Sequence, residues 1–408
     1  MAAGRAPPSR ALYHWYLGSP EADARAADAV RLLEPLGEST ELAASYGEVA
    51  RQAMLDNRSE EAIEWGERAV ALAERTGAID VRALALNTVG TAMTHDGRTH
   101  GLELVRESLR LSLEHELVGH AQRAYNNLWA ASARLAVSAA ELRRIHDESL
   151  QHARRYGLRL PVLLNREAVY ALRDGDWDRA LQLIEEFDPE IVWYASWEVA
   201  GLALIALARE GPEHVLPLID APRRRLLAAD AQSRASAGHS AEVLLLAGDL
   251  RGTLEHAEVV AKLLADDYWH PGVSAAAMSA ITAARLLADE VALTRWIELS
   301  LTQGSHPGAR YQQSRRAFAK AELAARDGDR ESALAMLSQC VELLVDALPV
   351  QGSFARLRRA ELLLENGDRE GASAELAAAL TYWRKAKATW YLGQLRAWPA
   401  ERGLAFPE

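Results

Sequence analysis

Residues 326–334 read RDGDRESAL, and related stretches recur at 173–181 (RDGDWDRAL) and 365–372 (ENGDREGA). In each, a glycine supplies the left-handed residue that ends one helix, and the aspartate after it can cap the next helix. Apolar residues at helical spacing follow the turn. A small residue near the start of the second helix lets the two helices approach closely; these residues are Ala62, Ala180, Ala333 and Ala372. Each stretch therefore predicts a tight turn between two packed helices.

Similar turns recur along the whole chain. They fall near positions 57, 97, 137, 175, 211, 248, 289, 328 and 367, in steps of 36 to 41 residues. This step is the length of a helical-hairpin repeat, and no β-branched run of alternating polarity indicates a sheet. We predict an all-α fold, a right-handed superhelical solenoid of about nine to ten helical hairpins. Residues 1–18 would form a tail and a partial first hairpin, residues 19–408 a single solenoid, and about 376–398 a terminal capping helix.

Composition excludes several classes of protein. The 408 residues include one cysteine, Cys340, so neither a disulfide framework nor a cysteine-based zinc cage is possible. The net charge of −11 argues against a broad phosphate-binding surface. No apolar run approaches the roughly 18 residues that cross a bilayer, and the N-terminus lacks the apolar core of a signal peptide. We expect a cytoplasmic protein with no direct nucleic-acid or membrane partner and a buried Cys340.

The turns at 175–181 and 328–334 resemble those of the tetratricopeptide repeat (TPR), although the step is longer than its 34-residue unit. A further resemblance covers residues 19–135. It rests on AVRLLEPL at 29–36, SEEAIEWGERA at 59–69, ALNTVGTA at 85–92 and ESLRL at 107–111. Together these are similar to the MalT-like TPR region of large ATP-binding LuxR-type transcription regulators. The resemblance implies a sensing or scaffolding role.

In that family an NTPase module precedes the repeats and a DNA-binding module follows them. This sequence contains no G-x-x-x-x-G-K-[ST] phosphate loop, and no helix-turn-helix pattern follows the stretch 389–398. We therefore expect neither nucleotide hydrolysis nor direct DNA binding by this chain.

Signals of catalysis are missing as well. The motifs H-E-x-x-H, G-x-S-x-G and G-x-G-x-x-G do not occur. His95 and His100 are five residues apart, as are His115 and His120, whereas a metal pair on one helix face is four apart. We expect no metal, no cofactor and no enzymatic activity.

A periodic set of asparagines is the main candidate binding site. Asn87, Asn126 and Asn165 are 39 residues apart, and Glu48 lies a further 39 residues upstream. Equivalent positions of a solenoid stack into a ladder, and first helices line its concave groove. An amide offers a donor and an acceptor, so the ladder can hold an extended peptide backbone; Asn127 can take the same part. The alternative is that these asparagines bond to neighbouring helices and set the angle between repeats.

Aromatic residues form two further groups. Trp193 and Trp197 lie one helical turn apart near the middle of the chain, either in the core or as a stacking wall for a ligand in the groove. Trp390 and Trp398, near the end, either cover the last repeat or mark a surface on which a partner docks.

From these features we predict a noncatalytic scaffold in bacterial-type signalling or transcription regulation. Its groove would hold a protein or peptide segment, or a small-molecule effector. One alternative is a regulator subunit that docks through its ends onto a separate NTPase or DNA-binding chain. A second is an enzyme with a site inside the helical toroid. The sequence leaves the oligomeric state open.

Overall fold

The computed structural model describes residues 21–135, 137–158, 161–185, 192–215, 238–265, 271–302, 310–345 and 348–407, and these residues form helices and turns without a strand. The chain divides into two compact units, unit 1 (Met1–Arg159) and unit 2 (Leu160–Glu408), which are described separately here. The prediction of an all-α solenoid of successive helical hairpins is confirmed. Its superhelical hand and its continuity through residues 19–408 remain predictions.

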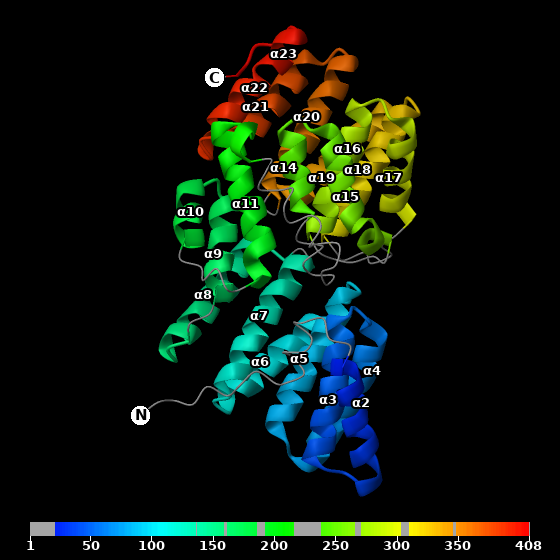
Figure 1. The fold of residues 1–408 in the computed structure, drawn as a ribbon, viewed down its shortest axis with the longest axis vertical. Coiled ribbons are helices and arrows are strands. Elements are labelled where there is room, and N and C mark those ends of the chain that lie inside the picture. Colours follow the sequence, from blue (N-terminus) through cyan, green and yellow to red (C-terminus); the bar gives the residue numbers. More distant parts are fainter. Residues whose placement is uncertain are drawn as a thin grey trace. The chain divides into compact units, whose positions relative to one another are not determined.

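Unit 1 is an array of antiparallel helical hairpins (Figure 1). The hairpins are α3–α4, α5–α6 and α7–α8, and the first helices α3, α5 and α7 also pack side by side. The elements are α2 (Glu21–Leu33), η1 (Glu34–Leu36), α3 (Thr40–Leu55), α4 (Ser59–Thr76), α5 (Ile79–His95), α6 (Gly101–Glu114), α7 (Val118–Arg134) and α8 (Ala139–Arg155).

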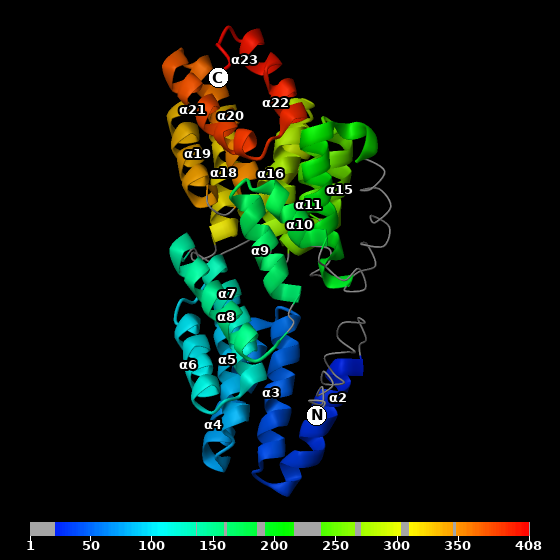
Figure 2. The same cartoon turned by 90° about the vertical axis from the view of Figure 1, so that its left-hand side faces the viewer.

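Unit 2 repeats this arrangement with hairpins α9–α10, α14–α15, α16–α17, α18–α19 and α20–α21 (Figure 2). Its elements are α9 (Pro161–Arg173), α10 (Trp177–Glu185), α11 (Val192–Glu210), η2 (Pro212–His214), α14 (His239–Leu246), α15 (Leu250–Ala265), α16 (Pro271–Leu286), α17 (Glu290–Thr302), α18 (Arg310–Arg326), α19 (Arg330–Leu344), α20 (Pro349–Glu365), α21 (Arg369–Lys385), α22 (Thr389–Leu395) and α23 (Ala397–Glu401).

The turns between helices have the predicted chemistry. Gly328 has a φ of 82°, and its amide and that of Asp329 donate to carbonyls of the preceding helix at 3.2 and 2.9 Å. The Asp329 carboxylate then accepts a hydrogen bond from Ser332 N at 3.1 Å and caps α19. The small residues expected after the turns are fully buried: Ala62, Ala180, Ala333 and Ala372. Cys340 is buried as expected, and burial raises the pKa of its thiol.

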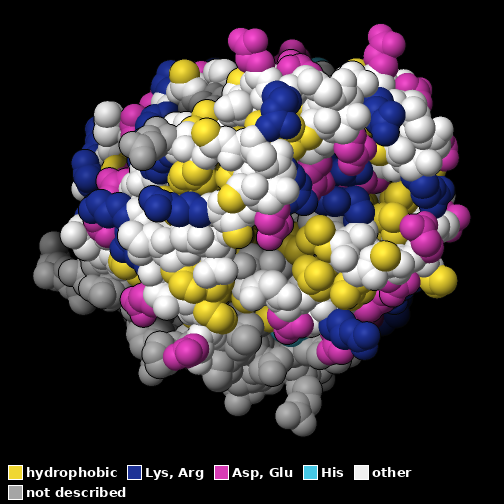
Figure 3. Space-filling view, turned by 90° about the horizontal axis from the view of Figure 1, so that it is seen from above, with side chains coloured by type: hydrophobic (Ala, Val, Ile, Leu, Met, Phe, Trp, Pro, Cys, Tyr) yellow, Lys and Arg dark blue, Asp and Glu magenta, His cyan; other side chains and the backbone are white. Residues whose placement is uncertain are grey.

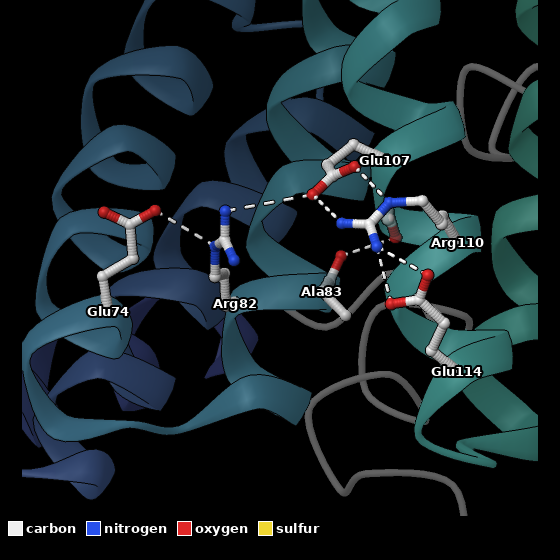
Figure 4. A network of polar contacts seen from close by, with 7 residues as sticks. Glu74, Arg82, Ala83, Glu107, Arg110 and Glu114 are labelled. Carbon is white, nitrogen blue, oxygen red and sulfur yellow. Dashed lines mark hydrogen bonds and ion pairs between the residues drawn. The ribbon is translucent and has the colours of Figure 1, made fainter.

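Polar contacts join the hairpins of unit 1 at their surface (Figure 4). Arg110 Nη1 lies 2.6 Å from Glu114, and its Nη2 lies 2.6 Å from Glu107. Arg82 connects this group to Glu74, with its Nε 3.1 Å from the carboxylate. Such half-exposed ion pairs each contribute little to stability. The arrangement chiefly adds polar contacts between α4, α5 and α6.

Unit 2 closes on itself. α11 packs against both α14 and α22, so contacts run from α11 through α14, α16, α18, α19, α20 and α21 to α22 and back to α11. Figure 1 shows α22 beside α11. One hydrophobic cluster joins the first and last helices of the unit, and it includes Trp177, Leu207, Trp383 and Tyr391. The Trp177 and Trp383 rings meet edge to face with centroids 6.0 Å apart, a favoured aromatic geometry.

Polar groups reinforce this closure. Tyr382 donates from its hydroxyl to Leu172 O at 2.9 Å and accepts from Trp177 Nε1 at 3.2 Å. Asp178 pairs with Arg209 at 2.9 Å and with Lys387 at 2.7 Å. These residues are separated by up to 210 positions in the chain. The closure is therefore a long-range contact between the beginning and the end of unit 2.

The end of the chain differs from the expected single helix over about 376–398. This range contains the end of α21, all of α22 and the start of α23. Lys387 has a φ of 55° and ends the α21 turn, and Pro399, which lacks an amide hydrogen, lies in the first turn of α23.

Seen from above, unit 2 has acidic and basic side chains interspersed with apolar ones (Figure 3).

Candidate functional site

A polar stripe crosses the first helices α3, α5 and α7 of unit 1, and it contains most of the predicted asparagine ladder. We define the stripe as Glu48, Arg51, Gln52, Asn87, Arg123, Asn126 and Asn127. All lie within helices that pack on one another. The stripe consists of a hydrogen-bonded group on α3 and a hydrogen-bonded pair that joins α5 to α7.

Glu48 forms the charged end of the stripe. It accepts hydrogen bonds from Arg51 Nε at 2.9 Å and from Gln52 Nε2 at 3.0 Å. Burial raises the pKa of Glu48, but these hydrogen bonds and the positive charges of Arg51 and Arg123 together bring it below the ordinary value. The carboxylate is therefore ionised at neutral pH. Arg123 belongs to α7, so its field reaches α3 across the intervening α5.

Asn87 lies in the centre of the stripe and is only 1% exposed. Its side-chain oxygen accepts a hydrogen bond from Asn127 Nδ2 on the next first helix, 40 residues on. Its own Nδ2 is buried and has no hydrogen-bond partner among the described residues. Half of this amide therefore joins α5 to α7, as the structural interpretation of the ladder expects, and the other half is unsatisfied.

Asn126 and Asn127 are both half-buried, in contrast to Asn87. Gln122 Nε2 donates to Asn126 Oδ1 at a long 3.4 Å, and more closely to Ser149 Oγ of α8 at 2.8 Å. The more accessible amides of the stripe are thus on α7. Of the predicted residues, Asn87 and Asn127 are in contact with each other, whereas Glu48 and Asn126 form hydrogen bonds within their own helices.

Sequence reasoning missed a second link between α5 and α7. Arg134 donates to Thr94 Oγ1 at 2.8 Å, and both side chains are buried. Burial, and then the positive charge of Arg134, hold the pKa of the adjacent His95 well below its ordinary value of 6.5. Thr94 and Arg134 are 40 residues apart, the same spacing as Asn87 and Asn127. That shared spacing was the sequence signal for the link.

Three predicted residues lie in unit 2, on helices whose side chains at these positions fall outside the described part of the structure. Asn165 is in α9, and Trp193 and Trp197 are in α11. Their roles in a groove remain predictions.

The terminal tryptophans pack, partly buried, against the cluster that closes unit 2. The indole of Trp390 lies over Gly211, where a Cβ atom would come within 3.0 Å of Nε1. The Trp398 ring has the Arg402 guanidinium 4.7 Å from its centroid. Trp390 thus takes part in closure, and its docking role, like that of Trp398, remains a prediction.

Within the described ranges, no three His, Cys, Asp or Glu side chains are grouped so that they would hold a metal ion. None of the helices in this part of the chain combines the length and apolar character needed to cross a bilayer.

These features define the class of protein: a helical-repeat protein with an all-α scaffold fold. The chain matches no known protein-family profile and no curated protein sequence. Among solved structures, it is similar to a "Circular tandem repeat protein with novel repeat topology and enhanced subunit contact surfaces", at 17% identity and a TM-score of 0.18, over 96% of this chain and 87% of that one. A TM-score of 0.18 does not indicate a shared fold, so the assignment of the fold class rests on the helices of this chain and their packing.

Proposed function

We propose that the chain is a noncatalytic binding scaffold whose polar stripe in unit 1 holds an extended peptide segment of a partner protein. The proposal is supported by two half-buried amides on α7, Asn126 and Asn127, and by the ionised carboxylate of Glu48 on α3. Amide side chains can donate to peptide carbonyls and accept from peptide amides at once. The carboxylate adds a preference for a segment that carries a positive charge.

The finer assignment follows the resemblance of residues 19–135 to the repeat region of LuxR-type regulators. We propose a role in cytoplasmic signalling or transcription regulation, with a peptide or a small-molecule effector as the bound group. The second candidate is a regulator subunit that docks through its end. It is supported by Trp390 and Trp398, which are only partly buried at the end of unit 2.

The test is a peptide-display selection on the immobilised chain, followed by calorimetry with the enriched peptides. The Asn126→Ala variant should bind them at least about tenfold more weakly, a loss of about 1.4 kcal/mol. A matched control is Gln394→Ala, which removes an exposed amide from α22 of unit 2. Equal affinity of wild type and Asn126→Ala, or no enriched peptide at all, would contradict the stripe as the binding site. Loss of binding in Trp398→Ala alone would favour the docking alternative.

A further inference from the structure

The Arg68 guanidinium lies against two aromatic rings at the first hairpin of unit 1. Its Cζ is 4.3 Å from the centroid of the Tyr46 ring and 4.1 Å from that of the Trp65 ring. The two rings have centroids 5.4 Å apart and are tilted by 46°. Arg68 Nη2 also donates to Glu34 Oε1 at 2.7 Å and to the Tyr46 hydroxyl at 3.0 Å. The guanidinium is therefore held by two π-faces, a carboxylate and a phenol oxygen.

The groups around Arg68 are held in place by contacts of their own. Tyr46 donates from its hydroxyl to Glu34 Oε1 at 2.8 Å, which joins η1 to α3. The Tyr46 ring is buried in the core cluster of the first repeats, and Trp65 packs against the same cluster. Hydrogen bonds from Tyr46 and Arg68 keep the pKa of Glu34 below its ordinary value, so the carboxylate is charged at neutral pH. Glu34, Tyr46 and Trp65 thus form a site that does not depend on Arg68 for its shape.

Arg68 is partly exposed to solvent in spite of these contacts. Its side chain is 39% exposed, and its partner Glu34 is 44% exposed. Ion pairs with this exposure are weak because water competes for both charges. A long, flexible side chain of this kind can rotate into solvent and leave the site open. Arg68 is therefore a displaceable occupant.

The surroundings indicate what would replace it. Leu32 and Leu36 are two positions either side of Glu34 in the chain and are 68% and 79% exposed. They are the most exposed large hydrophobic residues of unit 1 within its described part. The net charge of −11 favours approach of a cationic partner. An arginine with apolar neighbours matches both features. Its guanidinium can donate to Glu34 and Tyr46 as Arg68 does, whereas a trimethylated lysine has no N–H group to donate.

We propose that Glu34, Tyr46 and Trp65 form a binding site for an arginine side chain of a partner protein segment, and that Arg68 occupies this site in the free chain. The site lies on η1, α3 and α4 and is separate from the polar stripe residues of α5 and α7. It gives unit 1 a second point of recognition, for one particular side chain. Arg68 acts as an internal competitor that sets the affinity.

The test uses the capped peptide Ac-Leu-Arg-Leu-NH2 and its lysine and citrulline analogues, titrated calorimetrically into the full chain. We expect wild type to bind the arginine peptide, Arg68→Ala to bind it at least tenfold more tightly, and both to bind the two analogues at least tenfold more weakly. The double variant Arg68→Ala/Trp65→Leu should lose the gain. Arg75→Ala removes another exposed α4 arginine, which pairs with Glu38 at 2.9 Å, and should match wild type.

Three results would overturn the proposal. They are absence of binding to Arg68→Ala, equal binding by Arg68→Ala and the double variant, and binding to Arg68→Ala with none to wild type at millimolar peptide. The last would make Arg68 a permanent part of the fold. Far-UV circular dichroism of each variant checks that the helices are intact. Trp65→Phe keeps an aromatic face and should therefore retain most of the affinity for the arginine peptide. Asn126→Ala should bind the arginine peptide as wild type does, which separates this proposal from the polar stripe.

Discussion

Gly90 and Gly101 lie where α6 crosses α5, and they allow the two backbones to touch. A Cβ atom on Gly101 would fall 2.3 Å from the Gly90 carbonyl oxygen and 2.9 Å from both Met93 Cβ and Thr94 Cγ2. Real Cβ atoms essentially never come closer than 3.0 Å, and here the obstacle is backbone. The substitution Gly101→Ala therefore requires the helices to separate by about 0.7 Å at this point.

The expected cost follows from two opposing terms. Overpacking of a buried contact costs about 1–3 kcal/mol, because neighbours must shift from their packed positions. Alanine in place of glycine gains up to about 1 kcal/mol inside a helix, and less at the first residue of α6, where position 101 lies. We expect a net loss of about 1–2 kcal/mol in the free energy of unfolding. The matched control is Gly119→Ala in α7, where no atom lies within 4 Å of the added Cβ and stability should be unchanged or raised.

Native-state hydrogen exchange is the appropriate assay, because it reports on each helix separately and does not require the two compact units to unfold in one transition. Amides of α5 and α6 should lose protection in Gly101→Ala, whereas those of α18 and α19 should keep it. Unchanged or increased protection of α5 in this variant would refute the close-contact argument. A comparable loss in Gly119→Ala would show that the effect does not come from the helix crossing.

Three further outcomes are expected. Trp383→Ala should destabilise unit 2 by about 3–5 kcal/mol in urea unfolding and expose α9–α11 to protease, since the ring is fully buried where the unit closes. Asn127→Ala should lower the free energy of unfolding by about 1–3 kcal/mol in thermal unfolding, because it leaves the Asn87 oxygen buried and unpaired. Asn127→Asp should destabilise the chain at least as much, because its carboxylate can only accept a hydrogen bond. The pKa of His95 lies below 6.5 in the folded chain, so the unfolded chain takes up this proton at a higher pH than the folded chain does. The free energy of unfolding should therefore fall as the pH drops below about 6.5, and it should fall less in His95→Gln. A His95 pKa above 6.5, measured by NMR on the folded chain, would contradict this.

Local chemistry explains how far the sequence predicts the fold. The left-handed glycines and capping aspartates act within a few residues, so turns such as Gly328–Asp329 were predictable in position and conformation. The break between α21 and α22 was not, because Lys387 rather than glycine adopts the left-handed conformation there. Closure of unit 2 also escaped prediction. It depends on how small rotations accumulate over the hairpins, and no single repeat encodes that sum.

The sequence predicted which helices carry the asparagines, but not how the amides pair. A 39-residue step identified Asn87 and Asn126 as equivalent, yet the hydrogen bond joins Asn87 to Asn127. The rotation of each helix about its axis decides which of two adjacent amides faces the neighbour, and a step that varies along the chain does not determine that rotation. Arg123 was missed for the same reason, since its influence on Glu48 depends on the approach of α3 and α7 across α5.

The closed circuit of contacts in unit 2 has a consequence for how this part of the protein can change. An open array gains or loses a repeat at modest cost, because each repeat touches only its neighbours. In unit 2 each hairpin along the circuit contributes a share of the angle that returns α22 to α11. Deleting one hairpin would reduce the total rotation and duplicating one would increase it, so in either case α22 would no longer meet α11. We therefore expect relatives of this protein to vary in side chains and loop lengths within unit 2 while the number of its hairpins stays constant.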